Sequence, residues 1–499
     1  MSGQFSKNSR PALAGEYFNW SAQRALSVEP STGSIVVVPA TGNWGPVNSP
    51  TLLNAFEDQT ALFGSKDSPL QRGVYGAFKG EGRAGHGGAG AVLAVRMATS
   101  DAAVATKVLN NVAGSPAVFL TFTAKYKGTR GNDYRFTVQA GTTGGTKDLI
   151  ILDGTLVLAT YTFSETDAAA AAALVNADPN SPFTAAAGVG TGTAIANISA
   201  SAATGGLDGD TLTGTEWANL FTQLDSQRWS IFAAYGLTDS TIRASLVAWI
   251  KTRNERGQRA MAVMGGGDAE AFTTANTRST TANSWNIVNI GGPSLRLDDL
   301  AVNATTAEFA VRVAGAIANR GLRGDLIYAR FAGVSQIDGT SLATQAQQET
   351  ARSSGTTVFC RDNRSAEDGP IFIRDGVTTY ADDSQSPLDE GVKMKPVALY
   401  RVIKNIRIQQ YIELTISEWA TSGDILGMLP VNDKTRALVK GFITQLYTAL
   451  EQQEVVSPGW VVELDTAPPP TDLQDFIQYA HAFSPTRALR QLYNTARIA

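Results

Sequence analysis

The chain has 499 residues, of which 43% are hydrophobic and only 17% carry a charge. This hydrophobic content can fill several cores, so a wholly disordered chain is excluded, and the net charge of −4 argues against nucleic acid as a partner. A single cysteine, Cys360, excludes an intrachain disulfide and cysteine-rich zinc sites. A chain so poor in charge suits a subunit that covers much of its surface with copies of itself.

Signals for export or membrane insertion are missing from the sequence. The N-terminal residues contain no apolar core of the length that a signal peptide needs. No run of about 18 apolar residues occurs, so we expect no helix that spans a membrane. We therefore expect the protein to be made and assembled in a cytoplasm.

The first part of the chain changes from polar to α/β. Residues 1–30 are mostly polar with spaced apolar anchors, which predicts an extended N-terminal arm. Residues 31–100 are expected to begin an α/β domain, because Ser34–Pro39 is a short apolar run typical of a buried strand. Helical spacing follows over 52–63 and 70–79, and a second apolar strand over 92–95 is expected after them.

Residues 101–210 have a different character and predict a β-sandwich-like insertion domain. Asp153–Gly154 lies between two apolar runs, a strong signal for a hairpin. Residues 167–175 form one alanine-rich helix, and 185–209 are either a strand pair or a long loop. The expected strands are 118–123, 134–139, 149–152, 155–158 and 161–163.

Residues 211–345 are expected to resume the α/β domain. Thr213 and Glu216 have the spacing of a capping box before a helix that ends near Asp225. Strands and helices then alternate, which predicts a mixed, largely parallel sheet flanked by helices. The expected strands are 229–234, 259–264 and 285–290, and the expected helices are 240–253 and 305–317.

Residues 346–487 predict an α+β C-terminal domain, and 488–499 a C-terminal arm. Two long helices stand out, one over 396–419 and one that begins at Asn432–Asp433, with an apolar side chain at about every fourth position from Leu438. The expected strands are 357–359, 371–373, 460–464 and 476–483.

The chain shows no recognisable catalytic motif. Gly80, Gly82 and Gly85 match a dinucleotide fingerprint by letter, but a helix is expected before them and a strand after them, which is the reverse of the required order. The pairs Asp298–Asp299 and Asp382–Asp383 could hold a cation, although adjacent carboxylates in loops are more often solvated or capping. We therefore expect no catalytic residue, no metal and no cofactor.

Several segments resemble contractile phage tail sheath proteins of the myovirus type. The similar segments are SIVVVPATGNWGP (34–46), AKYKGTRGNDYRFTV (124–138), LTGTEWANLFTQLDSQRWSIFAAYG (212–236), AGAIANRGLRGDLIYARFAGV (314–334), IFIRDGVTTYADD (371–383), PVNDKTRALVKGFITQLYTAL (430–450) and QYAHAFSPTRALRQLYNTARI (478–498). Their order along nearly the whole chain carries the resemblance, since no single motif is unique.

The resemblance implies a structural subunit of a virion tail sheath. Such subunits form a helical homo-oligomer of stacked hexameric rings around a tail tube protein, with baseplate and tail terminator proteins as further partners. Contraction of the sheath drives the tube through the host envelope. Arms at both chain ends would add strands to neighbouring subunits.

The resemblance also assigns roles to side chains. Candidate tube-facing basic residues lie near or on the two long helices; the other reading of them is a solvated basic face. They are Lys395, Arg401, Lys404, Arg407, Lys434, Arg436 and Lys440. The candidate arm anchors are Leu13, Tyr17, Phe18, Leu489, Leu492, Tyr493 and Ile498.

Three alternatives stay open from the sequence. A sheath from a non-viral contractile particle, such as a bacteriocin or injection device, would share the same physics. An α/β enzyme would need a nucleophile or phosphate loop at strand ends, and none is seen. A β-rich adhesin would need a secretion signal.

Overall fold

The computed structural model describes residues 3–4, 17–18, 34–64, 67–361, 370–380, 401–422, 429, 432–464 and 479–486. The chain divides into two compact units. One comprises Ser31–Leu414 with Ala488–Ala499, and the other Met1–Pro30 with Thr415–Arg487. The division falls inside helix α10 (Ile403–Ser422), not at residue 346, where the sequence suggested a domain boundary.

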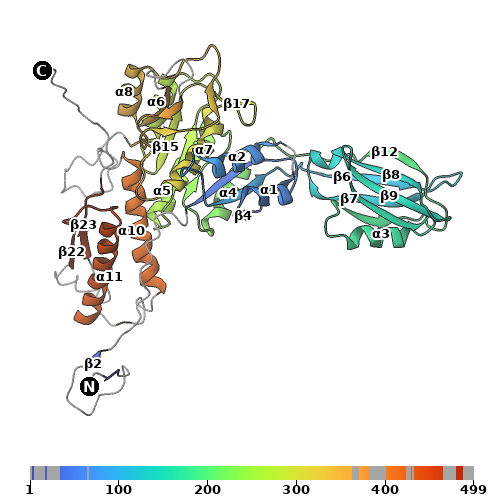
Figure 1. The fold of residues 1–499 in the computed structure, drawn as a ribbon, viewed down its shortest axis with the longest axis horizontal. Helices are drawn as coiled ribbons and strands as arrows, with labels where there is room; N and C mark the ends of the chain where they lie inside the picture. Colours follow the sequence, from blue (N-terminus) through green and yellow to red (C-terminus); the bar gives the residue numbers. More distant parts are fainter. Residues whose placement is uncertain are drawn as a thin grey trace. The chain divides into compact units, whose positions relative to one another are not determined.

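The larger unit is built on a nine-stranded sheet with the order β18-β21-β20-β15-β14-β13-β3-β5-β4 (Figure 1). The six strands from β20 to β5 in this order are paired in parallel, and β4, β21 and β18 at the margins are antiparallel. The predicted α/β class is confirmed. The strands are β3 (Ile35–Thr41), β4 (Thr51–Leu53), β5 (Ala91–Met97), β13 (Ile231–Phe232), β14 (Met261–Gly265), β15 (Ile287–Gly291), β18 (Ala329–Arg330), β20 (Thr356–Arg361) and β21 (Ile371–Ile373).

Strands β20 and β21 differ from the expectation, because the sequence analysis assigned both to the C-terminal domain. Instead β20 pairs in parallel with β15, and β21 pairs with β20. Strand β15 is distant in sequence from β20, so no local pattern could reveal that pairing.

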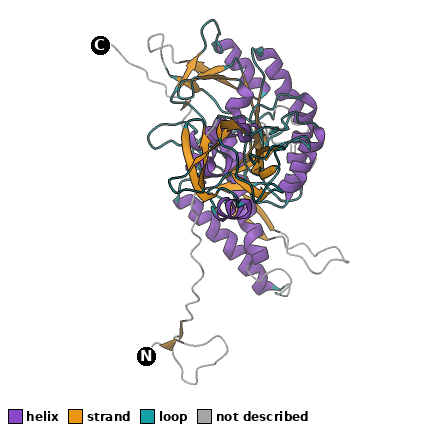
Figure 2. Cartoon of the chain, turned by 90° about the vertical axis from the view of Figure 1, so that its right-hand side faces the viewer, coloured by secondary structure: helices purple, strands orange, loops and turns teal. Residues whose placement is uncertain are grey.

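Helices cover both faces of this sheet (Figure 2). Along β3, Val36 and Val38 point into one core and Val37 into the other, so the strand is a continuous apolar run. Helices α2 (Pro69–Lys79) and α7 (Thr306–Asn319) contribute to the first core, and α4 (Gly214–Asp225) and α5 (Ser240–Glu255) to the second.

Capping boxes start several helices of this unit, among them α4 and α7. Glu216 accepts a hydrogen bond from Thr213 N at 2.8 Å, as the sequence predicts, and Glu308 accepts one from Thr305 N at 2.8 Å. The expected helix over 52–63 begins only after β4. Three further helices of the unit are α1 (Phe56–Phe63), α6 (Phe272–Ala282) and α8 (Gln345–Ser354), and the sequence analysis missed the last two.

Between β5 and α4 the chain forms two antiparallel sheets around one core that includes Phe119, Phe122, Phe136 and Phe183. The hairpin at Asp153–Gly154 is confirmed, since β9 and β10 flank it and pair with each other. One sheet has the order β10-β9-β8-β12 and the other β11-β7-β6. The elements are β6 (Val104–Asn110), β7 (Val118–Lys127), the 3₁₀ turn η1 (Thr129–Asp133), β8 (Tyr134–Ala140), β9 (Thr146–Asp153), β10 (Leu156–Ser164), α3 (Ala168–Ala177), β11 (Phe183–Ala187) and β12 (Ile198–Ala202).

A buried arginine joins this insertion to the main sheet. Arg96, at the end of β5, has a fully buried side chain. Its Nε donates to Gly42 O at 2.7 Å, and its Nη1 donates to Gly45 O at 2.9 Å and to Lys127 O at 2.6 Å. Burial lowers the pKa of Arg96 to about 10.

The larger unit also contains a small antiparallel sheet. Its strands are β16 (Leu295–Leu297), β17 (Val302–Ala304) and β19 (Val334–Gln336).

The smaller unit contains the end of α10, helix α11 (Asp433–Gln452) and an antiparallel pair of strands. These strands are β22 (Val461–Leu464) and β23 (Tyr479–Ala482). Two further short strands, β1 (Gly3–Gln4) and β2 (Tyr17–Phe18), pair in parallel.

Candidate assembly surfaces

Arg401 is bound to its own chain. Its Nε donates to Tyr380 O at 2.7 Å, and its Nη2 donates to Ser353 O at 2.7 Å, in the last turn of α8. A cation at a helix C-terminus satisfies carbonyls that have no partner inside the helix. Arg401, one of the residues that the sequence analysis expected to face the tube, therefore caps another helix.

Arg407 and Lys404 also turn toward their own chain. Arg407 donates to Gly321 O at 2.7 Å, to Ile317 O at the end of α7 and to Ser34 Oγ at 2.6 Å. Burial lowers the pKa of Arg407 to about 10. Lys404 is only 4% exposed, and burial lowers its pKa despite the opposing effect of Asp325. Such positions argue against the tube contact that the sequence suggested for these two residues.

The basic residues of α11 are placed differently. Asn432 caps this helix, since its Oδ1 accepts from Thr435 N at 3.0 Å, as predicted. Lys434 and Lys440 are exposed and Arg436 is partly exposed. Among the described residues, no carboxylate lies within ion-pair distance of these three.

A glycine interrupts the exposed side of α11. Gly441 lies in the helix interior, where glycine costs about 1 kcal/mol relative to alanine. A Cβ at Gly441 would meet nothing within 4 Å, so packing among the described residues does not require the glycine. Leu438, one turn earlier, is 37% exposed.

The strand pair β22–β23 rests on α11. Val462 is opposite His481 in the register, and His481 Nδ1 lies 3.1 Å from Tyr447 Oη of α11. Tyr447 is fully buried and stacks on Trp460, with ring centroids 5.4 Å apart. Within the described part of the chain no third strand pairs with β22 or β23.

Few of the predicted arm anchors lie in the part of the chain that the structure describes. Tyr17 and Phe18 form β2. Leu13, Lys395 and the pair Asp382–Asp383 lie outside the described residues, as do the C-terminal anchors Leu489, Leu492, Tyr493 and Ile498.

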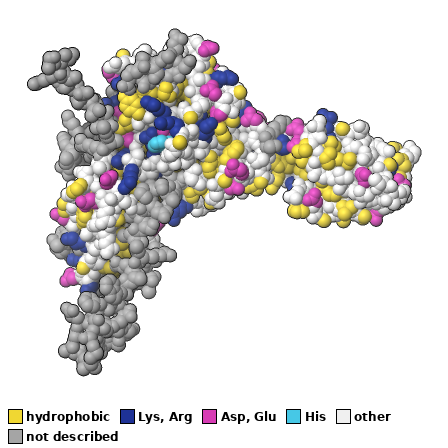
Figure 3. All heavy atoms as spheres, in the orientation of Figure 1, with side chains coloured by type: hydrophobic (Ala, Val, Ile, Leu, Met, Phe, Trp, Pro, Cys, Tyr) yellow, Lys and Arg dark blue, Asp and Glu magenta, His cyan; other side chains and the backbone are white. Residues whose placement is uncertain are grey.

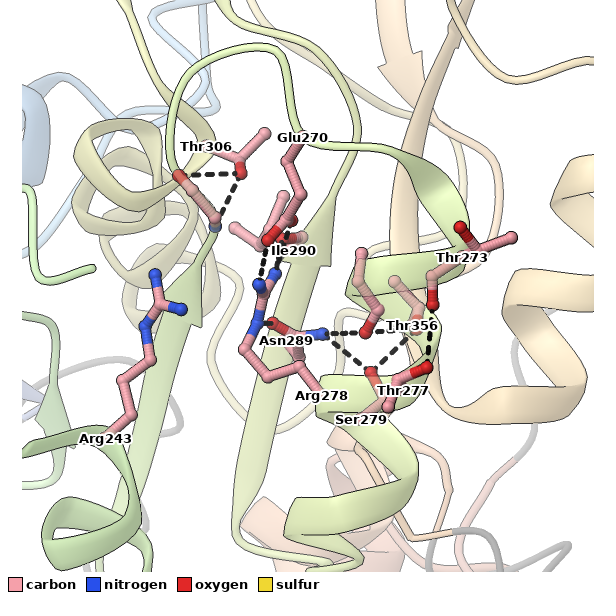
Figure 4. A network of polar contacts seen from close by, with 12 residues as sticks. Arg243, Glu270, Thr273, Thr277, Arg278, Ser279, Asn289, Ile290, Thr306 and Thr356 are labelled. Atoms are coloured by element: carbon pink, nitrogen blue, oxygen red, sulfur yellow. Dashed lines mark hydrogen bonds and ion pairs between the residues drawn. The ribbon is translucent and has the colours of Figure 1, made fainter. Parts of the chain in front are cut away.

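A polar network at the carboxyl end of the main sheet is the place where an α/β enzyme would carry its site. Figure 4 shows Arg278 between Glu270 and Asn289; Arg278 Nη2 donates to Glu270 Oε2 at 2.8 Å and its Nε donates to Asn289 Oδ1 at 2.7 Å. Asn289 Nδ2 in turn donates to Ser279 Oγ at 2.7 Å. These groups bind one another and attach α6 to β15, which is an architectural role.

Other candidate chemistry also has structural partners. Asp299 accepts from Tyr75 Oη at 2.8 Å and pairs with Lys79, and Asp298 accepts from Ser335 Oγ at 2.7 Å. Among the described residues, no group of three His, Cys, Asp or Glu side chains could hold a metal. None of the described helices combines the length and the hydropathy of a membrane span. Figure 3 shows acidic and basic side chains interspersed over the visible face, in keeping with the small net charge.

Comparison with known proteins finds others of similar architecture. Residues 210–375 match the family model of the phage tail sheath protein central domain. A sheath tail protein from Desulfitobacterium hafniense aligns with a TM-score of 0.67 at 18% identity, over 94% of this chain and 100% of that one. A sheath tail protein from Listeria innocua aligns with a TM-score of 0.62 at 16% identity, over 92% and 97%.

A more distant likeness reaches beyond phage tails. The helical sheath of the anti-feeding prophage in its contracted state aligns with a TM-score of 0.51 at 12% identity, over 98% of this chain and 99% of that one. A search of curated proteins finds no match. The structure thus has the fold of a contractile sheath protein. Residues 210–375 match the central domain of the phage tail sheath family, and the fold of the chain is that of sheath tail proteins, so the predicted resemblance is confirmed.

Proposed function

We propose that this chain is the sheath subunit of a contractile phage tail, a structural protein and not an enzyme. Its copies stack as hexameric rings around a tail tube and contract to drive that tube through a host envelope. The observation that carries the proposal is the two-stranded sheet on α11, whose two outer edges can each accept a strand from another subunit.

The strands to fill these edges would come from the arms. A strand pair is marginal alone, and an added strand on either side supplies main-chain hydrogen bonds while alternate side chains set the register. The candidate anchors are Leu13, Tyr17, Phe18, Leu489, Leu492, Tyr493 and Ile498. In this arrangement residues 1–30 and 488–499 link each subunit to its neighbours.

The exposed face of α11 would meet the tube. Lys434, Arg436 and Lys440 lack carboxylate partners among the described residues, so an acidic tube surface complements them. Gly441 lets another backbone approach the helix closely. Each exposed pair contributes only about 0–1 kcal/mol, which suits a contact that must release during contraction.

Baseplate and terminator proteins would bind the two ends of the sheath, and the particle would be completed as part of a virion. A sheath of a non-viral injection particle is the second candidate, because the contracted anti-feeding prophage sheath shares the fold over 98% of this chain.

Negative-stain electron microscopy of the purified chain at high concentration, with its tube protein added, tests the proposal. We expect hollow polymers with a regular helical surface. A chain that ends at Arg487 should remain a folded monomer, because it lacks the C-terminal arm. Normal polymers from this truncated chain would contradict the role of the arm, and monomers from the full chain would contradict the sheath function.

A further inference from the structure

The loop between β3 and β4 of the main sheet reaches into the insertion. We call residues 42–45, which follow β3 directly, the joint loop. The side chain of Trp44 is part of the hydrophobic core of the insertion, and the residue is only 5% exposed. The centroid of its ring lies 5.5 Å from that of Tyr126 and 5.5 Å from that of Tyr134. A side chain from outside the insertion therefore completes the core of the insertion.

The next residue holds the joint loop against the main sheet. Gly45 has a φ of +97°, and a Cβ there would lie 2.5 Å from Cδ1 of Phe63 on α1. Phe63 is 1% exposed and packs in the first core of the larger unit. Two consecutive residues, Trp44 and Gly45, thus contact two different cores. A rotation of the insertion about the joint loop would pull one of the two residues out of its contact.

The buried side chain of Arg96 connects the joint loop to the insertion through hydrogen bonds. Its Nε and Nη1 donate to Gly42 O and Gly45 O of the joint loop. The same Nη1 donates to Lys127 O of the insertion at 2.6 Å. The donors of a guanidinium group have fixed directions in one plane, so these contacts restrict orientation as well as distance.

The backbone of the insertion also touches the joint loop directly. Arg130 N donates to Asn43 O at 3.3 Å, and a Cβ at Gly128 would lie 2.0 Å from the same oxygen. The two segments that connect the insertion to the main sheet pair with each other, since Ala103 N donates to Leu207 O at 3.0 Å and Leu207 N donates to Ala103 O at 3.1 Å. The insertion is thus attached through its paired connections, the arginine and the tryptophan.

Domains of one chain are expected to move relative to each other unless a hydrophobic interface holds them. We propose that the joint loop is such a lock: it makes the insertion and the main sheet one rigid body, and Trp44 is the side chain that fixes their relative orientation. This property belongs to the single chain and does not depend on the sheath function. In any assembly of the chain, the insertion keeps its angle to the main sheet and follows its motion.

Distances between spin labels test the rigidity of the joint. The single native cysteine, Cys360, is buried, so the labels attach to introduced cysteines. The pair T160C/K251C joins exposed positions on β10 of the insertion and on α5, and the reference pair A346C/K251C joins α8 and α5. Pulsed electron paramagnetic resonance on the full chain should give equally narrow distance distributions for both pairs. A broad distribution for T160C/K251C alone would overturn the proposal.

Truncation of the indole tests the role of Trp44. W44A should broaden the distance distribution of T160C/K251C and leave that of A346C/K251C unchanged, whereas W44F, which keeps a ring in the core, should leave both narrow.

W229A is the matched control, because Trp229 is 4% exposed in the second core and precedes β13, whereas Trp44 follows the parallel strand β3. Circular dichroism confirms that each variant is folded. A narrow distribution in W44A, or equal broadening in W44A and W229A, would overturn the role of Trp44. The measurement on the unaltered joint decides the proposal even where W44A does not fold.

Discussion

Two groups of basic side chains follow each other in the sequence and have opposite surroundings. Arg401, Lys404 and Arg407 turn into the larger unit, where Arg401 and Arg407 bind carbonyls at the ends of α8 and α7. Lys434 and Lys440 on α11 are exposed. A basic run along a helix therefore indicates a binding face only where the chain itself leaves the charges without partners.

The largest effect is expected from removing Arg407. R407A should lower the free energy of unfolding by about 3 kcal/mol, because Gly321 O, Ile317 O and Ser34 Oγ lose a charged donor in a partly buried place. Urea denaturation followed by circular dichroism measures the change. R436A, on the partly exposed side of α11, should change stability by less than about 0.5 kcal/mol. Equal losses of unfolding free energy in R407A and R436A would contradict the distinction between the basic residues that bind their own chain and those on α11.

A smaller effect of opposite sign is expected at Gly441. G441A should stabilise the free chain by about 0.5–1 kcal/mol, because alanine is the better helix former and its methyl group meets nothing. The same change should weaken decoration of tubes if a partner approaches that position. Thermal denaturation and co-sedimentation with tubes measure the two effects. Stabilisation without loss of tube binding would show that Gly441 does not lie on the tube-binding face.

The smallest effect is a pH dependence at Lys404. Burial lowers its folded-state pKa below 10.5, so the cost of the buried charge is fully present at neutral pH. As pH rises through the lowered value toward 10.5, the folded chain loses this proton before the unfolded chain does, and the cost disappears. The stability of K404M relative to the unaltered chain should therefore fall between neutral and alkaline pH. A constant difference would mean that Lys404 is not buried as a cation.

Local signals predicted much of the larger unit. The capping box at Thr213, the hairpin at Asp153–Gly154 and the buried run of β3 depend on neighbouring residues, and the structure confirms all three. Helix α6 was missed because its sequence, FTTANTRSTTA, has almost no apolar face. Asn289 and Ser279 hold it in place through contacts that only the folded chain brings together.

The candidate surfaces were harder to predict than the fold. The sequence identified the basic residues of α10 and α11 but not which of them are buried, since the partners of Arg407 lie 86 and 90 positions away. It also found Gly80, Gly82 and Gly85 but not the ion pair beside them, because Glu81 and Arg320 are 239 positions apart. Exposure and pairing between distant segments follow from the tertiary fold.

The most direct test of α11 as the tube-binding face compares the triple variant K434E/R436E/K440E with the unaltered chain. Electron micrographs at low and moderate salt show how much of each protein decorates the tubes. The account predicts that the triple variant folds normally and leaves tubes bare, and that decoration by the unaltered chain weakens as salt rises. Full decoration by the triple variant would contradict the assignment of α11 as the tube-binding face.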